Sequence, residues 1–228
     1  MATSVPNLDA IQIAGVNALV FDLDGTLVDS TSGIGRALSA AFQSAGRTMP
    51  AVDLRRFIGP PITEIALRIE PSLSEAELSA IELSYRSNYD NEGWRDTVVY
   101  PAVADTLHAL HRLGFRLFIL TNKPLLPTSN ILEHLGLQKL FVETLARDSR
   151  TPRYASKSEM LGDLIDRHDL SSSDTLMIGD ASEDQEAART NGLHFLHVTY
   201  GYGTATMPAR SIRHFSEIAA LLNVSPTQ

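Results

Sequence analysis

Two aspartates separated by one residue, Asp22 and Asp24, follow a short apolar run near the start of the sequence. The run, residues 18–21, reads ALVF and has the length and composition of a buried strand. Because residues i and i+2 of a strand point the same way, two like charges meet at its end and repel each other. A divalent cation that prefers oxygen ligands, such as Mg²⁺, would neutralise them. Together with Gly25, the same residues are also typical of a turn, so a metal site here depends on the rest of the chain.

Further polar side chains follow other apolar runs. Thr121 and Asn122 come directly after one run, and Asp180 and Asp184 come after another. Lys157 opens a predicted helix, where a cation opposes the helix dipole and a bound anion would remove that conflict. Phosphoryl transfer requires a nucleophile, a proton carrier and neutralisation of the phosphate charge, and these groups could supply all three.

The elements that position these residues alternate between strand and helix after residue 97. Strands are expected at 115–120, 140–145, 175–178 and 194–198, and helices at 103–114, 125–135, 156–167 and 183–190. Such alternation with short apolar strands predicts an α/β fold, a Rossmann-like parallel sheet with helices on both faces and right-handed crossovers.

The segment 30–96 differs, because its patterns are all helical. Apolar residues recur at helical spacing between 34 and 42 and between 62 and 69, and Ser74 to Glu77 has the form of a capping box. We therefore predict a core formed by residues 1–29 and 97–228, with an inserted all-helical cap domain at 30–96. Open α/β sheets bind ligands at the carboxyl ends of their strands, so the cap is expected over that edge.

In order and spacing, these segments resemble the motifs of the haloacid-dehalogenase-like phosphohydrolases, and the resemblance extends over about residues 17–222. It implies that Asp22 is the nucleophile that forms an aspartyl-phosphate. Asp24 would protonate the leaving oxygen and later deprotonate the attacking water. Mg²⁺ would bind the side chain of Asp22 and the backbone carbonyl of Asp24, and Gly25 would let the backbone approach the phosphate.

The same resemblance assigns the remaining site residues. Thr121 would bond a phosphoryl oxygen with help from Asn122, and Lys157 would hold the phosphoryl group and the nucleophile. Asp180 would ligate Mg²⁺. Whether Asp184 or Glu183 also contacts the metal, directly or through water, stays open. Many members carry proline where this chain has Ser158, and three nearby arginines could compete for the role of Lys157: Arg147, Arg150 and Arg153. Lys123 is expected to be solvated.

The leaving group is expected to meet the cap. The turn at 57–61 resembles that of phosphoglycolate-phosphatase-like and nucleotidase-like members, which makes Gly59, Pro60 and Arg56 candidate substrate-binding residues. Asp24 matches the acid/base carboxylate that dehalogenases of the family lack, and its presence therefore favours phosphate chemistry. The segment 30–96 contains no lysine and no histidine, which argues against phosphonate cleavage and weakens a sugar-phosphate mutase. The expected substrate is a small phosphorylated metabolite, phosphoglycolate first and a nucleoside monophosphate second. A phosphomutase or phosphotransferase and a non-catalytic phosphate-binding module remain alternatives.

Composition limits the possible partners. The chain has 228 residues, of which 43% are hydrophobic, and a formal net charge of −8. An acidic protein gains nothing from the field of a nucleic acid or an anionic membrane, so neither is an expected partner. The sequence contains no cysteine and therefore no disulfide or thiolate metal site, and its start lacks the features of a secretory signal, which favours the cytoplasm. It does not indicate an oligomeric state.

Overall fold

A six-stranded sheet forms the centre of the protein in the computed structural model, which describes residues 15–207 and 209–222. The spatial order is β5-β4-β1-β6-β7-β8, and every neighbouring pair is parallel. The strands are β1 (Ala18–Phe21), β4 (Arg116–Thr121), β5 (Glu143–Ala146), β6 (Thr175–Gly179), β7 (His194–Val198) and β8 (Arg210–Ile212). The α/β prediction is confirmed. Of the six strands of this sheet, only the short edge strand β8, which lacks a strong apolar run, was not predicted.

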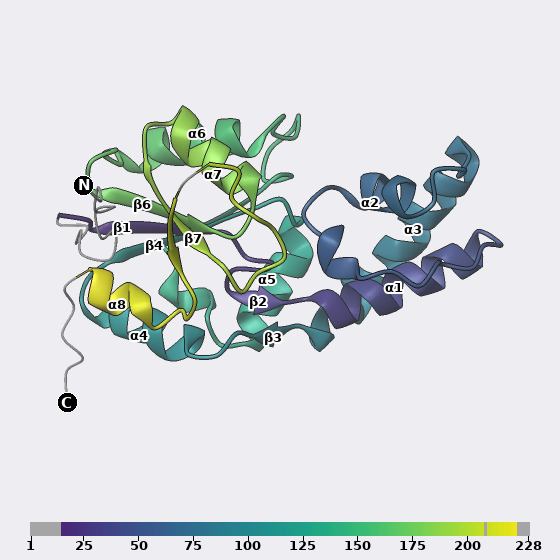
Figure 1. Cartoon of the computed structure of the whole chain (residues 1–228), viewed down its shortest axis with the longest axis horizontal. Coiled ribbons are helices and arrows are strands. Elements are labelled where there is room, and N and C mark those ends of the chain that lie inside the picture. Colours follow the sequence, from purple (N-terminus) through teal and green to yellow (C-terminus); the bar gives the residue numbers. More distant parts are fainter. Residues whose placement is uncertain (1–14, 208, 223–228) are drawn as a thin grey trace, which may run out of the picture.

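Helices cover both faces of this sheet, as Figure 1 shows. The helices of the core are α4 (Val103–Arg112), α5 (Leu125–His134), α6 (Lys157–His168), α7 (Ser182–Thr190) and α8 (Glu217–Leu221). Successive side chains of β1 point to opposite faces, so Leu19 packs with α4, α5 and α8 while Val20 packs with α6 and α7. This double burial explains why the central strands are continuously apolar. None of the described helices is long and apolar enough to cross a membrane.

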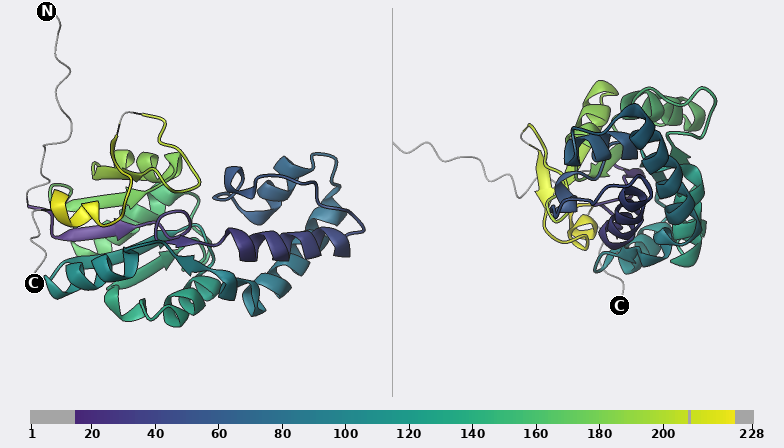
Figure 2. Two further views of the ribbon diagram at one scale, coloured as in Figure 1. Left: turned by 60° about the horizontal axis from the view of Figure 1, so that its bottom comes forward. Right: turned by 90° about the vertical axis from the view of Figure 1, so that its right-hand side faces the viewer.

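Three further helices form an all-helical unit inserted after β1. They are α1 (Thr31–Ser44), α2 (Ile62–Ile69) and α3 (Glu75–Asn91), with short 3₁₀ turns η2 (Leu54–Arg56) and η3 (Gly93–Asp96). Buried side chains such as Phe42, Ile65 and Ile81 give the unit a hydrophobic core of its own. At the start of α3, Ser74 and Glu77 form the predicted capping box. Figures 1 and 2 show this cap beside the carboxyl ends of the sheet strands.

The two chain segments that join core and cap pair with each other. The strands β2 (Val28–Asp29) and β3 (Val98–Val99) are antiparallel, with Val28 opposite Val99. Each strand has only two residues, too few for a recognisable alternation, which is why the sequence did not predict them. This ribbon holds both connections of the cap together at the border of the core.

Candidate active site

Four segments that lie far apart in the sequence meet at one edge of the sheet. Asp22 follows β1, Thr121 ends β4, Asp180 follows β6, and Lys157 opens α6. The carboxyl ends of parallel strands meet on the same side of a sheet, which explains the convergence. At its centre, Lys157 Nζ lies 2.5 Å from Asp22 Oδ1 and 2.5 Å from an oxygen of Asp184.

Lys157 is buried among these carboxylates. Burial alone would lower the pKa of its ammonium group, but the charges of Asp184 and Asp22 raise it above the ordinary value. Lys157 therefore stays charged over the physiological pH range. The unfavourable position of a cation at the start of α6 is offset by the two carboxylates that it contacts.

Three carboxylates form an acidic cluster around the end of β1. One oxygen from each of Asp22, Asp180 and Asp184 lies within 4.8 Å of the other two, and all three residues are buried. Burial raises the pKa of Asp22, and the neighbouring Asp184 and Asp180 raise it further, while Lys157 opposes the shift. A single ammonium group leaves this cluster with excess negative charge. Buried, hard oxygen donors at this spacing fit a divalent cation such as Mg²⁺.

The loop after β7 fixes the orientation of Asp180. The backbone N–H groups of Tyr202 and Gly203 donate to its Oδ2 at 2.7 and 2.9 Å. Gly201 is required for this close approach, because a Cβ on it would lie 2.3 Å from Asp180 Cβ. A Cβ on Gly25 would likewise lie 2.4 Å from Asp180 Oδ2, so Gly25 admits this carboxylate rather than lining the cavity. The loop reads Tyr-Gly-Tyr-Gly at residues 200–203, and the sequence did not identify Tyr202 as a site residue.

Asp24 has two partners of its own. Ser30 Oγ donates to Asp24 Oδ1 at 2.5 Å, and Lys123 Nζ lies 2.8 Å from Asp24 Oδ2. The expectation that Lys123 is solvated was wrong, because only 8% of this residue is exposed. Its ammonium group also lies 4.7 Å from the centre of the Tyr89 ring in α3 of the cap. Asp24 and Tyr89 lie far from Lys123 in the sequence, so the residues around Lys123 did not indicate these contacts.

The residues at the end of β4 and directly after it complete the floor of the site. Thr121 is buried, and its hydroxyl accepts a hydrogen bond from the backbone N–H of Lys123 at 3.2 Å. Asn122 Nδ2 donates to Glu183 Oε2 at 2.5 Å, which holds Glu183 on this side of the acidic cluster. Glu183 lines the cavity but is not a member of the three-carboxylate cluster. In this arrangement Asp184 contacts Lys157 while Glu183 is engaged by Asn122.

A cavity of about 300 Å³ lies between this floor and the cap. Gly59 and Pro60 of the cap turn line it, but Arg56 does not. The Arg56 side chain is 81% exposed and pairs with Asp53 at 3.4 Å. The cap wall is mostly apolar, with Ile34, Ile58, Pro61, Ile62, Ile65 and Tyr85. Arg147 and Arg153 also line the cavity, whereas Arg150 does not.

The model of the haloacid dehalogenase-like hydrolase family matches residues 19–198, which is most of the chain. The chain belongs to this family. The matched range includes every residue described above for the floor of the site except the loop that holds Asp180. The expectation of an enzyme of this family is thereby confirmed.

The chain is also similar to individual proteins over most of its length. The chain is 32% identical to a phosphoglycolate phosphatase of Aliivibrio fischeri over 82% of its length and 86% of that protein. It is 31% identical to the tyrosine-protein kinase PtkA of Mycobacterium tuberculosis over 82% of its length, but spans only 63% of PtkA. The solved structure of a haloacid dehalogenase-like family hydrolase from Streptococcus pneumoniae superposes with a TM-score of 0.80 at 28% identity, covering 90% of this chain and 98% of that one.

Proposed function

We propose that this protein is a phosphatase that hydrolyses a small phosphomonoester through an aspartyl-phosphate on Asp22. The contact of Lys157 with Asp22 and Asp184 carries the proposal, because it places a fixed positive charge beside a buried carboxylate nucleophile. Similarity to curated phosphoglycolate phosphatases supports the same reaction class.

In the first step, a carboxylate oxygen of Asp22 attacks phosphorus. The new bond joins that oxygen to phosphorus, and the bond from phosphorus to the leaving oxygen breaks. Asp24 in its acid form gives its proton to the leaving oxygen. Ser30 and Lys123, which contact the two carboxylate oxygens of Asp24, fix its orientation for this transfer.

In the second step, water attacks the phosphorus of the aspartyl-phosphate. Asp24, now a carboxylate, takes a proton from this water, and the bond between phosphorus and Asp22 breaks to release inorganic phosphate. Lys157 stabilises the charge on the phosphoryl oxygens in both steps, with the hydroxyl of Thr121 as a hydrogen-bond donor.

Asp22, Asp180, Asp184 and the backbone carbonyl of Asp24 would hold Mg²⁺. The bound ion would supply positive charge that offsets repulsion between the acidic cluster and a phosphate dianion. Glu183, whose carboxylate accepts a hydrogen bond from Asn122, would be a further oxygen donor near this ion.

For the substrate we propose phosphoglycolate first and a nucleoside monophosphate second. The turn at 57–61 places Gly59 and Pro60 on the cavity, where a leaving group would lie. Similarity to curated phosphoglycolate phosphatases favours phosphoglycolate as the substrate. We propose the cytoplasm as the location of the protein.

The test is phosphate release from a panel of small phosphomonoesters, with Mg²⁺ and with chelator, for the wild type, Asp22→Asn and Asp166→Asn. Asp166 is an exposed residue on α6 and serves as the matched control. We expect metal-dependent release that falls by at least about 1000-fold in Asp22→Asn and is unchanged in Asp166→Asn. Equal release by Asp22→Asn would contradict the proposal. Transfer of phosphate to an added acceptor, without release, would indicate a phosphotransferase instead.

A further inference from the structure

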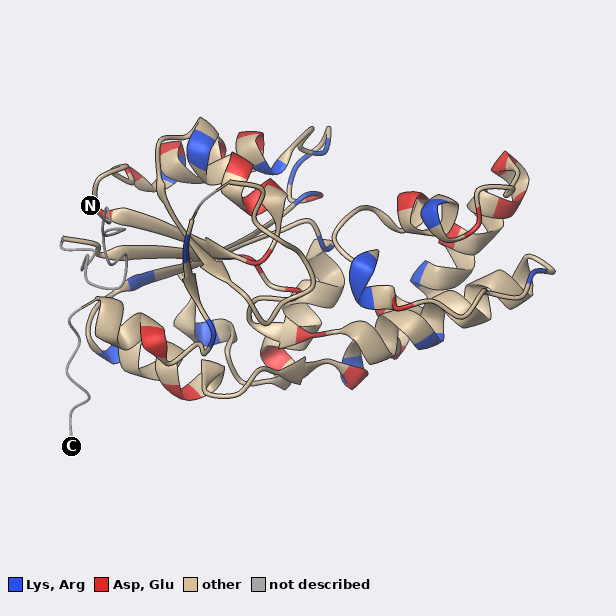
Figure 3. Ribbon diagram, viewed as in Figure 1, with Lys and Arg blue, Asp and Glu red and all other residues tan. Residues whose placement is uncertain are grey.

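The loop between β5 and α6 brings two arginines without carboxylate partners to the cavity. Arg147 and Arg153 both line it, together with Asp22 and Lys157. Neither guanidinium group has a carboxylate within ion-pair distance among residues 15–207 and 209–222. Figure 3 shows positively charged residues along this loop, at the end of the core nearest the cap.

This arrangement differs from that of most arginines in the chain. Nine of the sixteen arginines pair with a carboxylate in the part of the chain that the structure describes: Arg36, Arg47, Arg55, Arg56, Arg68, Arg86, Arg150, Arg167 and Arg189. Acidic residues outnumber basic ones by 27 to 19, so potential partners are plentiful. Of the arginines outside these pairs, only Arg147 and Arg153 line the cavity.

The guanidinium group of Arg147 is held in place by its own loop. Its Nε donates to the carbonyl of Tyr154 at 3.2 Å, and its Nη2 donates to the carbonyl of Ala155 at 2.7 Å. These two bonds restrict the side chain but leave its positive charge uncompensated. A guanidinium group that is already oriented loses little entropy when it binds an anion.

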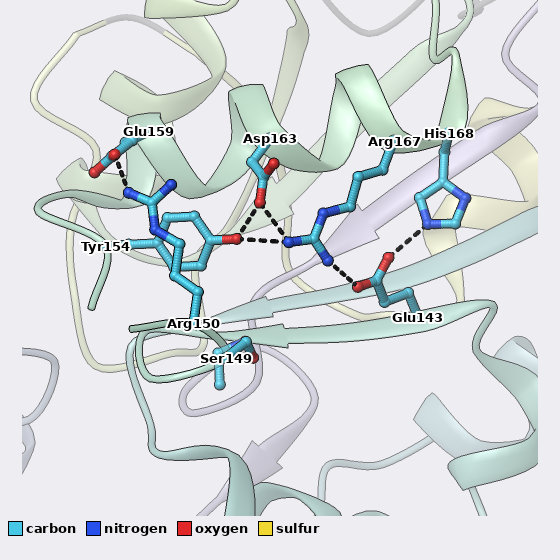
Figure 4. A network of polar contacts seen from close by, with 9 residues as sticks. Glu143, Ser149, Arg150, Tyr154, Glu159, Asp163, Arg167 and His168 are labelled. Atoms are coloured by element: carbon cyan, nitrogen blue, oxygen red, sulfur yellow. Dashed lines mark hydrogen bonds and ion pairs between the residues drawn. The ribbon is translucent and has the colours of Figure 1, made fainter. Parts of the chain in front are cut away.

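A network of polar contacts braces the loop against α6 (Figure 4). The hydroxyl of Tyr154 donates to Asp163, and Arg167 Nη2 reaches the same carboxylate at 2.7 Å. Arg150 pairs with Glu159 and lies over the Tyr154 ring at 3.9 Å, and it does not line the cavity. The three arginines of the loop therefore divide into one that stabilises the loop and two that face the cavity.

Two acidic groups that line the cavity outside the three-carboxylate cluster have other contacts. Asp148 accepts the backbone N–H of Leu125 at 2.8 Å, and Glu82 pairs with Arg86 at 3.2 Å. Lys157 is likewise occupied by two carboxylates. An anionic group on a bound ligand is thus the partner that Arg147 and Arg153 lack.

We propose that Arg147 and Arg153 form a subsite for a second anionic group, carried by the leaving group of the substrate. A carboxylate or a second phosphate would satisfy the same guanidinium groups, because both accept bidentate hydrogen bonds. The inference rests on the proposed phosphatase function and deepens it: the enzyme selects phosphate esters whose leaving group is itself charged.

Three substrates with a two-carbon leaving group test the subsite: phosphoglycolate, ethanediol bisphosphate and ethyl phosphate, which lacks the second anion. The variants are Arg153→Ala, Arg153→Lys and Arg147→Gln, which keeps a side-chain donor for the loop carbonyls. Arg112→Ala removes an exposed positive charge from α4 and is the control. Melting temperatures establish that each variant is folded.

We expect Arg153→Ala and Arg147→Gln to raise KM for the preferred doubly anionic substrate by about 10- to 100-fold. The KM for ethyl phosphate should stay within about twofold of the wild-type value. Arg153→Lys should recover part of the loss. A larger rise in KM for phosphoglycolate would identify the second anionic group as a carboxylate. A larger rise for ethanediol bisphosphate would identify it as a phosphate.

Two other outcomes would overturn the subsite, and they are separable. An equal loss for all three substrates would mean that the arginines contact the transferred phosphoryl group, and no loss would mean that they contact neither group. In both cases wild-type turnover would still support the phosphatase. If the wild type hydrolyses none of the panel, the proposed function itself fails and the subsite fails with it.

Discussion

Lys123 connects Asp24, the proposed acid/base carboxylate, to the cap: its ammonium group lies 2.8 Å from Asp24 Oδ2 and 4.7 Å from the centre of the Tyr89 ring. Burial by itself would lower the pKa of Lys123, but Asp24 raises it above its ordinary value. The charge that orients Asp24 is therefore retained inside the protein, against an aromatic residue of α3.

Replacing Lys123 by methionine removes this charge while keeping most of the side-chain volume. We expect Lys123→Met to lower kcat by about 10- to 100-fold, because Asp24 loses the partner that orients it for proton transfer. KM should change little, and the free energy of unfolding should fall by about 1–3 kcal/mol. Lys139→Met, at an exposed position, is the matched control. A kcat equal to that of the wild type would show that Ser30 alone positions Asp24.

Metal binding should raise the melting temperature of the protein, which can be measured without an assay of turnover. The carboxylates of Asp22, Asp180 and Asp184 repel one another, and a divalent ion bound to the folded state alone would stabilise it. At about 100 times its Kd, Mg²⁺ should raise the melting temperature by roughly 5 to 10 °C. Asp180→Asn should lose most of this response, while Asp166→Asn should keep it. The same shift in both variants would place the ion elsewhere.

The sequence predicted those parts of the site that lie at strand ends. Asp22 and Asp180 follow continuous apolar runs, and their proximity at the carboxyl edge of the sheet follows from the parallel pairing of β1 with β6. Lys123 and Tyr202 were missed because their roles arise from contacts across the fold: Lys123 meets Asp24 and Tyr89, and Tyr202 supplies a backbone N–H to Asp180. Every residue except proline has a backbone N–H group, so the residue type does not indicate which one donates to a site.

Arg56 is a residue that the sequence placed at the substrate cavity but that does not line it. It ends η2 two residues before Ile58, where a run of cavity-lining residues begins, yet its side chain pairs with Asp53. Neighbours in a turn face different directions, and their sequence does not specify which one faces a ligand. The cap helices themselves were predictable, because α2 and α3 carry clear apolar periodicity and a capping signal.

The hydroxyl groups of two buried tyrosines should respond differently to removal. The Tyr154 hydroxyl donates to Asp163, whereas the Tyr89 hydroxyl has no hydrogen-bond partner among the described residues. We expect Tyr154→Phe to lower the free energy of unfolding by about 1–2 kcal/mol, because Asp163 loses a donor. Tyr89→Phe should leave it unchanged or raise it slightly. Urea denaturation of both variants beside the wild type measures the difference, and an equal loss in the two would contradict this reading of the loop network.

The capping box of α3 gives the cap a defined dependence on pH. Hydrogen bonds from Arg47 and from the backbone N–H of Ser74 lower the pKa of Glu77 to about 2 from its ordinary 4.5. Because the folded state lowers this pKa, the stabilisation is fully present above pH 4.5 and is lost as the pH falls towards 2. The melting temperature of Glu77→Gln should therefore lie below that of the wild type at neutral pH and approach it on acidification.

Thermal unfolding of both proteins at several pH values between about 7 and 3 measures this convergence. Glu75→Gln removes a charge from the same first turn of α3 without touching Ser74 or Arg47, and separates the capping contacts from a general effect of charge. If the difference in melting temperature between the wild type and Glu77→Gln stays constant as the pH falls, the Glu77 carboxylate does not stabilise the cap through these hydrogen bonds.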